Sequence, residues 1–216
     1  MAYEDFTTYT KTDPSDKLTV TASRVTATNI KGSDGWTEIY KNFGANHWSG
    51  DFTHLYTVCM TDLPSDGGLY LYRIHNGTYT VDNLLEVGGG TKRYDIVEQY
   101  TSTYYDYYGL TESTVYYSKF HRADSVGTYG TIYTYIYSDS ARTDLLDTLS
   151  LALHAKLDYS TMVPILMSGD VYGERSGYIE NLDLQESPGP TPVVASGRRS
   201  LVTRSRIKRA AFHQRF

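Results

Sequence analysis

Three carboxylates near the end of the chain form the most regular set of residues whose spacing bears on catalysis. Glu180, Asp183 and Glu186 stand three residues apart. Hydrolysis of a glycosidic bond uses two carboxylates that flank the scissile bond. In a β-strand, residues three apart point to opposite faces of the sheet, so Glu180 and Asp183 would not face one substrate. We therefore predict no catalytic residue in this set.

Other catalytic motifs are missing from the sequence. The six histidines are scattered along the chain, and no Gly-x-Ser-x-Gly nucleophile elbow occurs. The glycine run at residues 88–90 follows no strand-to-helix pattern and is not a phosphate loop. Cys59 is the only cysteine, which excludes an internal disulfide and favours a small buried hydrophobe. These observations predict that the chain is not an enzyme.

Aromatic side chains are the strongest candidates for ligand binding. Four tyrosines flank one aspartate immediately before Gly109. In a loop, adjacent tyrosines would present rigid contact area to a sugar at low entropic cost. In a strand, alternate tyrosines would instead fill the core, and the others would cover an outer face. Trp48 is expected in the core. The predicted carbohydrate-binding residues are Trp36, Tyr104, Tyr105, Tyr107 and Tyr108.

No cofactor is predicted, and the one ion that the sequence brings into consideration is Ca²⁺. Four aspartates occupy turn-like positions, where carboxylates and carbonyls are the ligands that calcium prefers. They are Asp62, Asp66, Asp139 and Asp144. Because these residues form no contiguous ligand loop, we assign no metal ligand.

Apolar and polar residues alternate with a period of two along most of the chain, the pattern of half-buried strands. Between residues 51 and 60, for example, Phe52, His54 and Tyr56 share one face, and Leu55 and Cys59 share the other. The 22 tyrosines and many threonines favour sheet, and turn residues separate the runs. The expected strands lie within residues 18–28, 51–60, 68–74, 94–100, 115–120, 128–137, 145–153 and 177–184.

Three segments carry a resemblance to a known family: residues 40–54, which include Asn46-His-Trp-Ser-Gly-Asp-Phe52, residues 123–149, and the ending 177–184. They resemble the concanavalin A-like lectin/glucanase superfamily in its laminin-G-type form, seen in phage and metagenomic proteins. The resemblance implies an all-β, antiparallel two-sheet jelly-roll sandwich over residues 1–187. It also implies that a first strand near residues 6–9 pairs beside the last strand.

A proline-rich linker at residues 188–196 is predicted to separate this body from a basic C-terminal tail at residues 197–216. The tail holds seven of the 20 Lys and Arg and no acid, so the preceding 196 residues carry 13 basic and 25 acidic side chains, net −12. Apolar residues interleave with the charges, which favours docking to a protein over nucleic acid. The predicted anchoring residues are Arg204, Arg206, Lys208, Arg209, Phe212 and Phe216.

These observations lead to three hypotheses about function. The first is a non-enzymatic structural or binding module of a virion, such as a phage decoration, fibre or spike head protein, anchored to other subunits by the tail. The second is a lectin-like carbohydrate-binding module, and the third is a diverged glycoside hydrolase. We expect a location on a virion surface or outside the cell. The N-terminal residues lack the basic and apolar regions of a signal peptide, and no apolar stretch is long enough to span a membrane.

Overall fold

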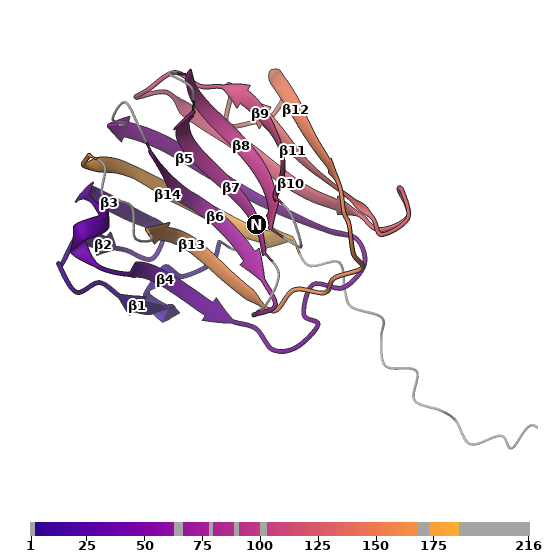
Figure 1. Ribbon diagram of the computed structural model, residues 1–216, viewed down its shortest axis with the longest axis horizontal. Coiled ribbons are helices and arrows are strands. Elements are labelled where there is room, and N and C mark those ends of the chain that lie inside the picture. Colours follow the sequence, from indigo (N-terminus) through magenta and orange to yellow (C-terminus); the bar gives the residue numbers. More distant parts are fainter. Residues whose placement is uncertain are drawn as a thin grey trace, which may run out of the picture.

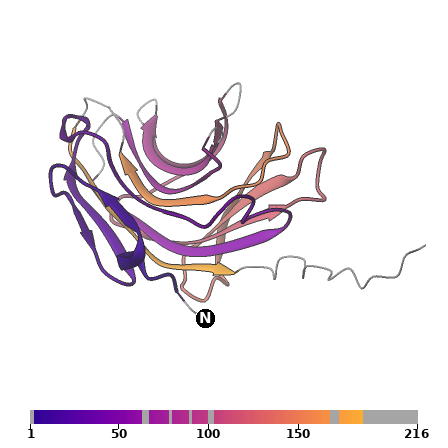
Figure 2. The same ribbon diagram turned by 90° about the horizontal axis from the view of Figure 1, so that it is seen from below.

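The chain folds into two antiparallel β-sheets that face each other (Figures 1 and 2). The computed structural model describes residues 3–62, 67–77, 80–88, 91–99, 103–167 and 173–185. Within these ranges, helical structure is limited to two short 3₁₀ turns, η1 (Phe6–Thr8) and η2 (Gly32–Asp34), and no helix is long and apolar enough to cross a membrane. The linker, the tail and the six predicted anchoring residues lie outside the described residues. The predicted all-β jelly-roll sandwich is confirmed.

Each sheet has seven strands in the described ranges, and neighbours in the order below are hydrogen-bonded. Sheet A runs β1 (Thr10–Thr12), β4 (Thr37–Asn42), β13 (Thr161–Met167), β6 (Gly67–His75), β7 (Thr80–Gly88), β8 (Thr91–Gln99), β9 (Thr103–Gly109). Sheet B runs β12 (Leu145–Ala152), β11 (Thr131–Tyr137), β10 (Val115–Ala123), β5 (Phe52–Asp62), β14 (Arg175–Gln185), β3 (Arg24–Ile30), β2 (Leu18–Val20). Strands that are distant in sequence are therefore neighbours in space.

The core lies between the sheets and follows the alternation seen in the sequence. On β5, Phe52, Tyr56 and Val58 are buried in the core, as predicted, while Leu55 and Cys59 lie on the other side of the sheet. Trp48 and Cys59 are both buried, also as predicted. Apolar burial of this kind is the main favourable contribution to folding.

The closing strand does not pair as the family resemblance implied. β14 lies between β5 and β3 near the middle of sheet B, whereas residues Phe6–Thr8 form the 3₁₀ turn η1. The N-terminal segment contacts β14 through a backbone hydrogen bond in which Glu4 N–H donates to the Leu182 carbonyl at 2.7 Å. Asp5 caps this turn, because its carboxylate accepts a hydrogen bond from the Thr7 N–H and so stabilises the 3₁₀ conformation.

A β-bulge in β14 places Glu180 and Asp183 differently from the prediction. The register of β14 against β5 shifts between Glu180 and Asp183, and Asn181 adopts a left-handed φ of 55°. Glu180 pairs with Thr57, and Asp183 pairs with Leu55, so both carboxylates lie on the outer face of sheet B. The prediction that they point to opposite faces is wrong, because the bulge inserts a residue that breaks the period of two.

Sheet A is strongly curved, and its outer face is the concave one. Figure 2 shows the middle strands of the sheet bending away from sheet B at both ends. Side chains that point outward from sheet A therefore lie on this concave face. This concave face carries the residues described next.

Candidate functional site

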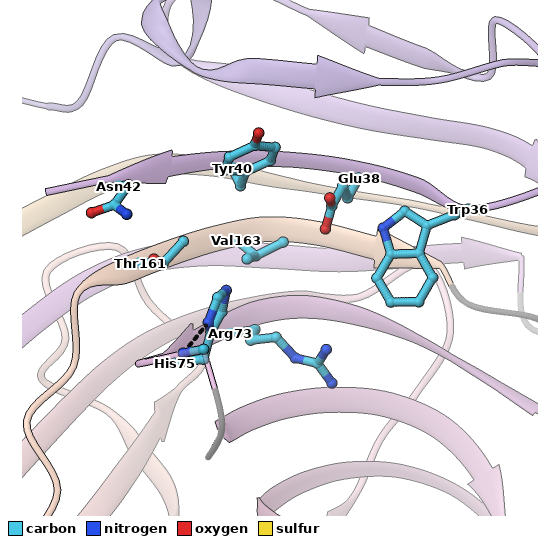
Figure 3. A pocket seen from close by; sticks show the side chains of 9 residues that line it. Trp36, Glu38, Tyr40, Asn42, Arg73, His75, Thr161 and Val163 are labelled. Atoms are coloured by element: carbon cyan, nitrogen blue, oxygen red, sulfur yellow. Dashed lines mark hydrogen bonds between the residues drawn. The ribbon is translucent and has the colours of Figure 1, made fainter. Parts of the chain in front are cut away.

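A pocket of about 430 Å³ opens on the concave face of sheet A, and β4, β13 and β6 supply most of its lining (Figure 3). Asn42, Thr161 and His75 lie at one end, while Trp36, Glu38 and Arg73 lie at the other. Ligand sites are commonly concave, with a small number of polar groups on a largely preformed surface. We therefore treat this pocket as the candidate site.

The β4 side of the pocket follows from strand geometry. Glu38, Tyr40 and Asn42 stand two residues apart and face the pocket, while Ile39 between them is buried in the core. The strand therefore presents a carboxylate, a phenol and an amide in a row. All three groups can exchange hydrogen bonds with a sugar.

The floor of the pocket is formed by β13, where a proline interrupts a central strand. Pro164 has no N–H, and the ladder between β13 and β4 shows a register shift between Met162 and Ile165. Thr161 and Val163 precede the proline and line the pocket from below. The Ser160 N–H donates to the His75 carbonyl at 3.0 Å and ties β13 to the end of β6.

His75 is the imidazole of the pocket, and its tautomer is set by the turn that follows β6. The Gly77 N–H donates to His75 Nδ1 at 3.0 Å, which the backbone achieves with a left-handed φ of 94° at Gly77. A nitrogen that accepts this bond carries no proton, so the neutral ring holds its proton on Nε2. Burial, and then the nearby Arg73 charge, lower the pKa of His75, so the ring is neutral at neutral pH. His75 is therefore a hydrogen-bond donor through Nε2.

Arg73 is the cation of the pocket. It lies two residues before His75 on β6, and its guanidinium carbon is 4.6 Å from the centroid of the Tyr70 ring. A guanidinium over an aromatic face is held in a defined orientation and binds carboxylates in bidentate fashion. Arg73 can therefore bind an anionic group that reaches the pocket.

Trp36 lies where the sequence suggested an exposed aromatic residue. Its side chain is 52% exposed at one end of the pocket. The turn η2 places it there: the Lys31 N–H donates to the Asp34 carboxylate, and Gly35 follows with φ 87°. A Cβ at Gly35 would lie 3.3 Å from the Pro14 ring, so glycine suits this position for both space and conformation. The role of Trp36 in sugar binding stays a prediction.

The tyrosine cluster lies in a strand and not in a loop. β9 spans Thr103–Gly109, and its residues alternate between faces. The Tyr108 ring packs against Tyr116 and the core, with centroids 6.1 Å apart, while Tyr107 is 50% exposed. The side chains of Tyr104 and Tyr105 lie outside the described residues. The strand interpretation therefore holds for the two tyrosines whose side chains are described.

Two of the candidate calcium ligands, Asp139 and Asp144, serve one local turn, while Asp62 is the last residue of β5. Asp139 accepts hydrogen bonds from the Thr143 and Asp144 N–H groups, and Asp144 accepts one from the Ser138 hydroxyl. These bonds lower the pKa of Asp139. Asp66 lies outside the described residues. Across the described ranges, no group of three or more His, Cys, Asp or Glu residues could hold a metal ion.

Sequence analysis missed the pocket residues Glu38, Tyr40, Asn42, Arg73 and His75. The sequence did hold a signal for them. In β4 and in β6 these polar residues stand two apart, the spacing that places side chains on one face of a strand. The carboxylates of β14 drew attention because they are regular, but the Glu180 carboxylate is bound in an ion pair by Arg24 on the far side of the sandwich.

Comparisons with known proteins address the fold. No protein-family model and no curated protein matches the sequence. Among solved structures, a functionally unknown protein from Saccharomyces cerevisiae has a TM-score of 0.58 at 11% identity, covering 83% of this chain and 97% of that one. A family 7 alginate lyase, A1-II', has a TM-score of 0.55 at 13% identity, with coverage of 84% and 96%. The PL-14 alginate lyase from Aplysia kurodai has a TM-score of 0.54 at 11% identity, with coverage of 78% and 87%.

These structures support the two-sheet jelly-roll fold. They also overturn one prediction. Several matched chains are alginate lyases of nearly the same extent, so this fold at this size carries catalysis, and the prediction that the chain is not an enzyme is wrong. That prediction rested on a search for catalytic residues within single segments, while the pocket draws its polar groups from three strands.

Proposed function

We propose that this protein binds an acidic polysaccharide on the concave face of sheet A and cleaves it by β-elimination. The observation that carries the proposal is the placement of Arg73, His75 and Tyr40 around one pocket. Elimination next to a uronate carboxylate needs a cation and hydrogen-bond donors for the carboxylate, together with groups that move a proton. The fold shared with alginate lyases supports the same reading.

Arg73 and His75 would bind the uronate carboxylate. The carboxylate gains negative charge when the proton on the adjacent carbon is removed, and donors aimed at that charge lower the barrier. Arg73 supplies the fixed positive charge, and His75 donates through Nε2–H. A neutral imidazole that already donates from Nε2 has no lone pair there for abstracting a proton. His75 therefore stabilises charge and does not act as the base.

Proton transfer would then fall to Glu38 and Tyr40 on β4. The Glu38 carboxylate accepts the proton from the carbon next to the uronate carboxylate, and the released electron pair forms a carbon–carbon double bond. The bond to the glycosidic oxygen breaks, and the Tyr40 hydroxyl donates its proton to that oxygen. Both side chains face the pocket from one strand, so they reach the same side of a bound sugar ring.

Hydrolysis fits the described lining less well. An acid and a nucleophile or base require two carboxylates flanking the bond. Among the side chains described around this pocket, Glu38 is the only carboxylate. A phenol, an imidazole and a guanidinium beside it suit elimination better than attack by water.

The test is cleavage of alginate, followed by the ultraviolet absorbance of the unsaturated uronate that elimination leaves. Wild type should produce this absorbance, and Tyr40→Phe should reduce the rate by roughly 10²- to 10⁴-fold, the usual contribution of a general acid or base. Tyr133→Phe, on the outer face of sheet B, is the matched control and should leave the rate unchanged. New reducing ends without absorbance would show hydrolysis, and no cleavage of alginate, polygalacturonate or hyaluronate would contradict the proposal.

Attachment to a particle stays a separate prediction. It rests on the phage-type resemblance and on the basic tail, residues 197–216. Deletion of residues 188–216 should abolish incorporation into a particle while the sandwich stays folded. A deleted protein that still attaches at wild-type occupancy would contradict it.

A further inference from the structure

A second arginine–tyrosine pair lies on the concave face, outside the pocket. The guanidinium carbon of Arg93 on β8 is 5.1 Å from the ring centroid of Tyr107 on β9. The first pair, Arg73 over Tyr70, has the corresponding distance of 4.6 Å. Among the described residues, the same combination of a cation and an aromatic face therefore occurs at two places on this face of sheet A.

The two pairs lie three strands apart on the concave face of sheet A. Tyr70 pairs with Leu84 of β7, Leu84 pairs with Asp95 of β8, and Asp95 pairs with Tyr107. Tyr70 and Tyr107 thus stand in one row across the strands, separated by three strand spacings, or about 14 Å measured along the sheet. A polymer lying across the strands would meet both pairs.

The second pair lies beside a buried carboxylate of the same strand. Arg93 Nε lies 3.6 Å from the Asp95 carboxylate, and the Asp95 side chain is 2% exposed while that of Arg93 is 20% exposed. Tyr107 is 50% exposed. Tyr107 is therefore the more exposed member of the pair, Arg93 is partly exposed, and the Asp95 carboxylate beside the guanidinium is covered.

We propose that Arg93 and Tyr107 form a second subsite, which binds another acidic sugar of the polysaccharide chain whose cleavage takes place at Arg73 and His75. The inference rests on the proposed function and adds to it that the substrate bears carboxylates on more than one sugar. Arg93 binds the carboxylate of the distant sugar, and the Tyr107 ring packs against the sugar face. A polymer with repeated charges is matched by a repeated cation–aromatic pair.

The chemistry of the pair distinguishes an anionic from a neutral polymer. Tyrosine alone would pack against any sugar ring, but a guanidinium binds a carboxylate by charge-assisted, bidentate hydrogen bonds. The subsite should therefore favour acidic chains, and this preference should weaken with salt, because exposed charges are screened.

The test compares alginate polymer with an alginate disaccharide, which is too short to reach from one pair to the other. Arg93→Gln and Tyr107→Ala should each weaken binding of the polymer by roughly threefold to thirtyfold, the range expected for one cation–aromatic contact. Binding of the disaccharide in the pocket should not change. Tyr135→Ala is the matched control, because Lys119 lies 5.2 Å from the Tyr135 ring centroid in a similar pair on the outer face of sheet B.

Failures of the two proposals are distinguishable. Wild type that neither binds nor cleaves alginate, polygalacturonate or hyaluronate overturns both of them. Wild type that binds the polymer while Arg93→Gln and Tyr107→Ala bind it equally well overturns the second subsite alone. If Arg93→Gln and Tyr107→Ala lose as much affinity for the neutral polymer laminarin as for alginate, the second subsite has no preference for acidic chains. Thermal unfolding of each variant shows whether it is folded, and Tyr107→Ala at an exposed edge position preserves the test if Arg93→Gln fails to fold.

Discussion

His75 shows how one backbone hydrogen bond assigns a chemical role to a side chain. The Gly77 N–H occupies the Nδ1 lone pair, and burial beside Arg73 keeps the ring neutral. The remaining nitrogen is then a donor, which suits the negative charge that develops on a uronate carboxylate. An imidazole acting as a base at Nε2 would need a proton on Nδ1, and that proton would point at the Gly77 N–H.

A pair of substitutions separates these two roles for His75. His75→Gln keeps an N–H donor and should retain most of the cleavage activity. His75→Leu removes the donor and should reduce kcat roughly tenfold to a hundredfold, because a hydrogen bond to a charged group contributes about 1.5–3 kcal/mol. The measurement is the initial rate of unsaturated product formation on alginate. Equal and severe losses in both variants would mean that His75 transfers the proton itself.

At the scale of the strands, β14 and β5 approach each other so closely at Gly177 that a side chain there would have no room. A Cβ on Gly177 would lie 2.8 Å from the Cys59 carbonyl oxygen and 2.8 Å from Met60 Sδ. The Met60 side chain can move, but the carbonyl oxygen belongs to the backbone of the neighbouring strand. Glycine at position 177 therefore allows β14 and β5 to pack at this spacing in sheet B.

Gly177→Ala should therefore destabilise the protein by about 1–3 kcal/mol, the usual cost of extra volume in a packed site. Gly109→Ala is the matched control, because nothing lies within 4 Å of a Cβ built there. The measurement is the free energy of unfolding in urea. An effect of Gly177→Ala no larger than that of Gly109→Ala would mean that the two strands separate without cost.

At the scale of the whole molecule, the core contains a histidine, His54, whose protonation is unfavourable in the folded state. His54 is fully buried between the sheets, and its Nδ1 lies 2.6 Å from the Tyr72 hydroxyl. Burial, and then the charge of His47, lower the pKa of His54 from 6.5 to about 3. In the unfolded chain the same imidazole meets water and titrates at its ordinary pKa.

The sign of the pH dependence follows from these two pKa values. As the pH falls below about 6.5, the unfolded chain binds a proton that the folded protein does not, so the folded state loses stability progressively toward pH 3. Between pH 7 and pH 5 this residue should account for a loss of about 2 kcal/mol. His54→Gln should show a smaller loss by that amount in urea unfolding, whereas His121→Gln on the outer face should not. An unchanged pH dependence in His54→Gln would contradict this account.

The fold was predictable to a large extent because alternation is a local property. A strand places successive side chains on opposite faces, so the burial of Phe52, Tyr56 and Val58 and the existence of β5 follow from neighbouring residues alone. The exception is instructive. The bulge at Asn181 depends on how β14 registers against β5, and no local pattern marked it, so the faces of Glu180 and Asp183 were assigned wrongly.

The sequence by itself determined eight strand segments with most of their faces, and the asymmetry between an acidic body and a basic tail, but the segments of β4, β7 and β13 were not among the predicted strands. Only the tertiary structure decided that β4, β13 and β6 are neighbours, although they lie far apart along the chain. Arg73, His75 and Tyr40 became one site through that pairing. Strand order depends on contacts between distant segments and on their loop-closure entropy, whereas period-two alternation is the same for every order of strands.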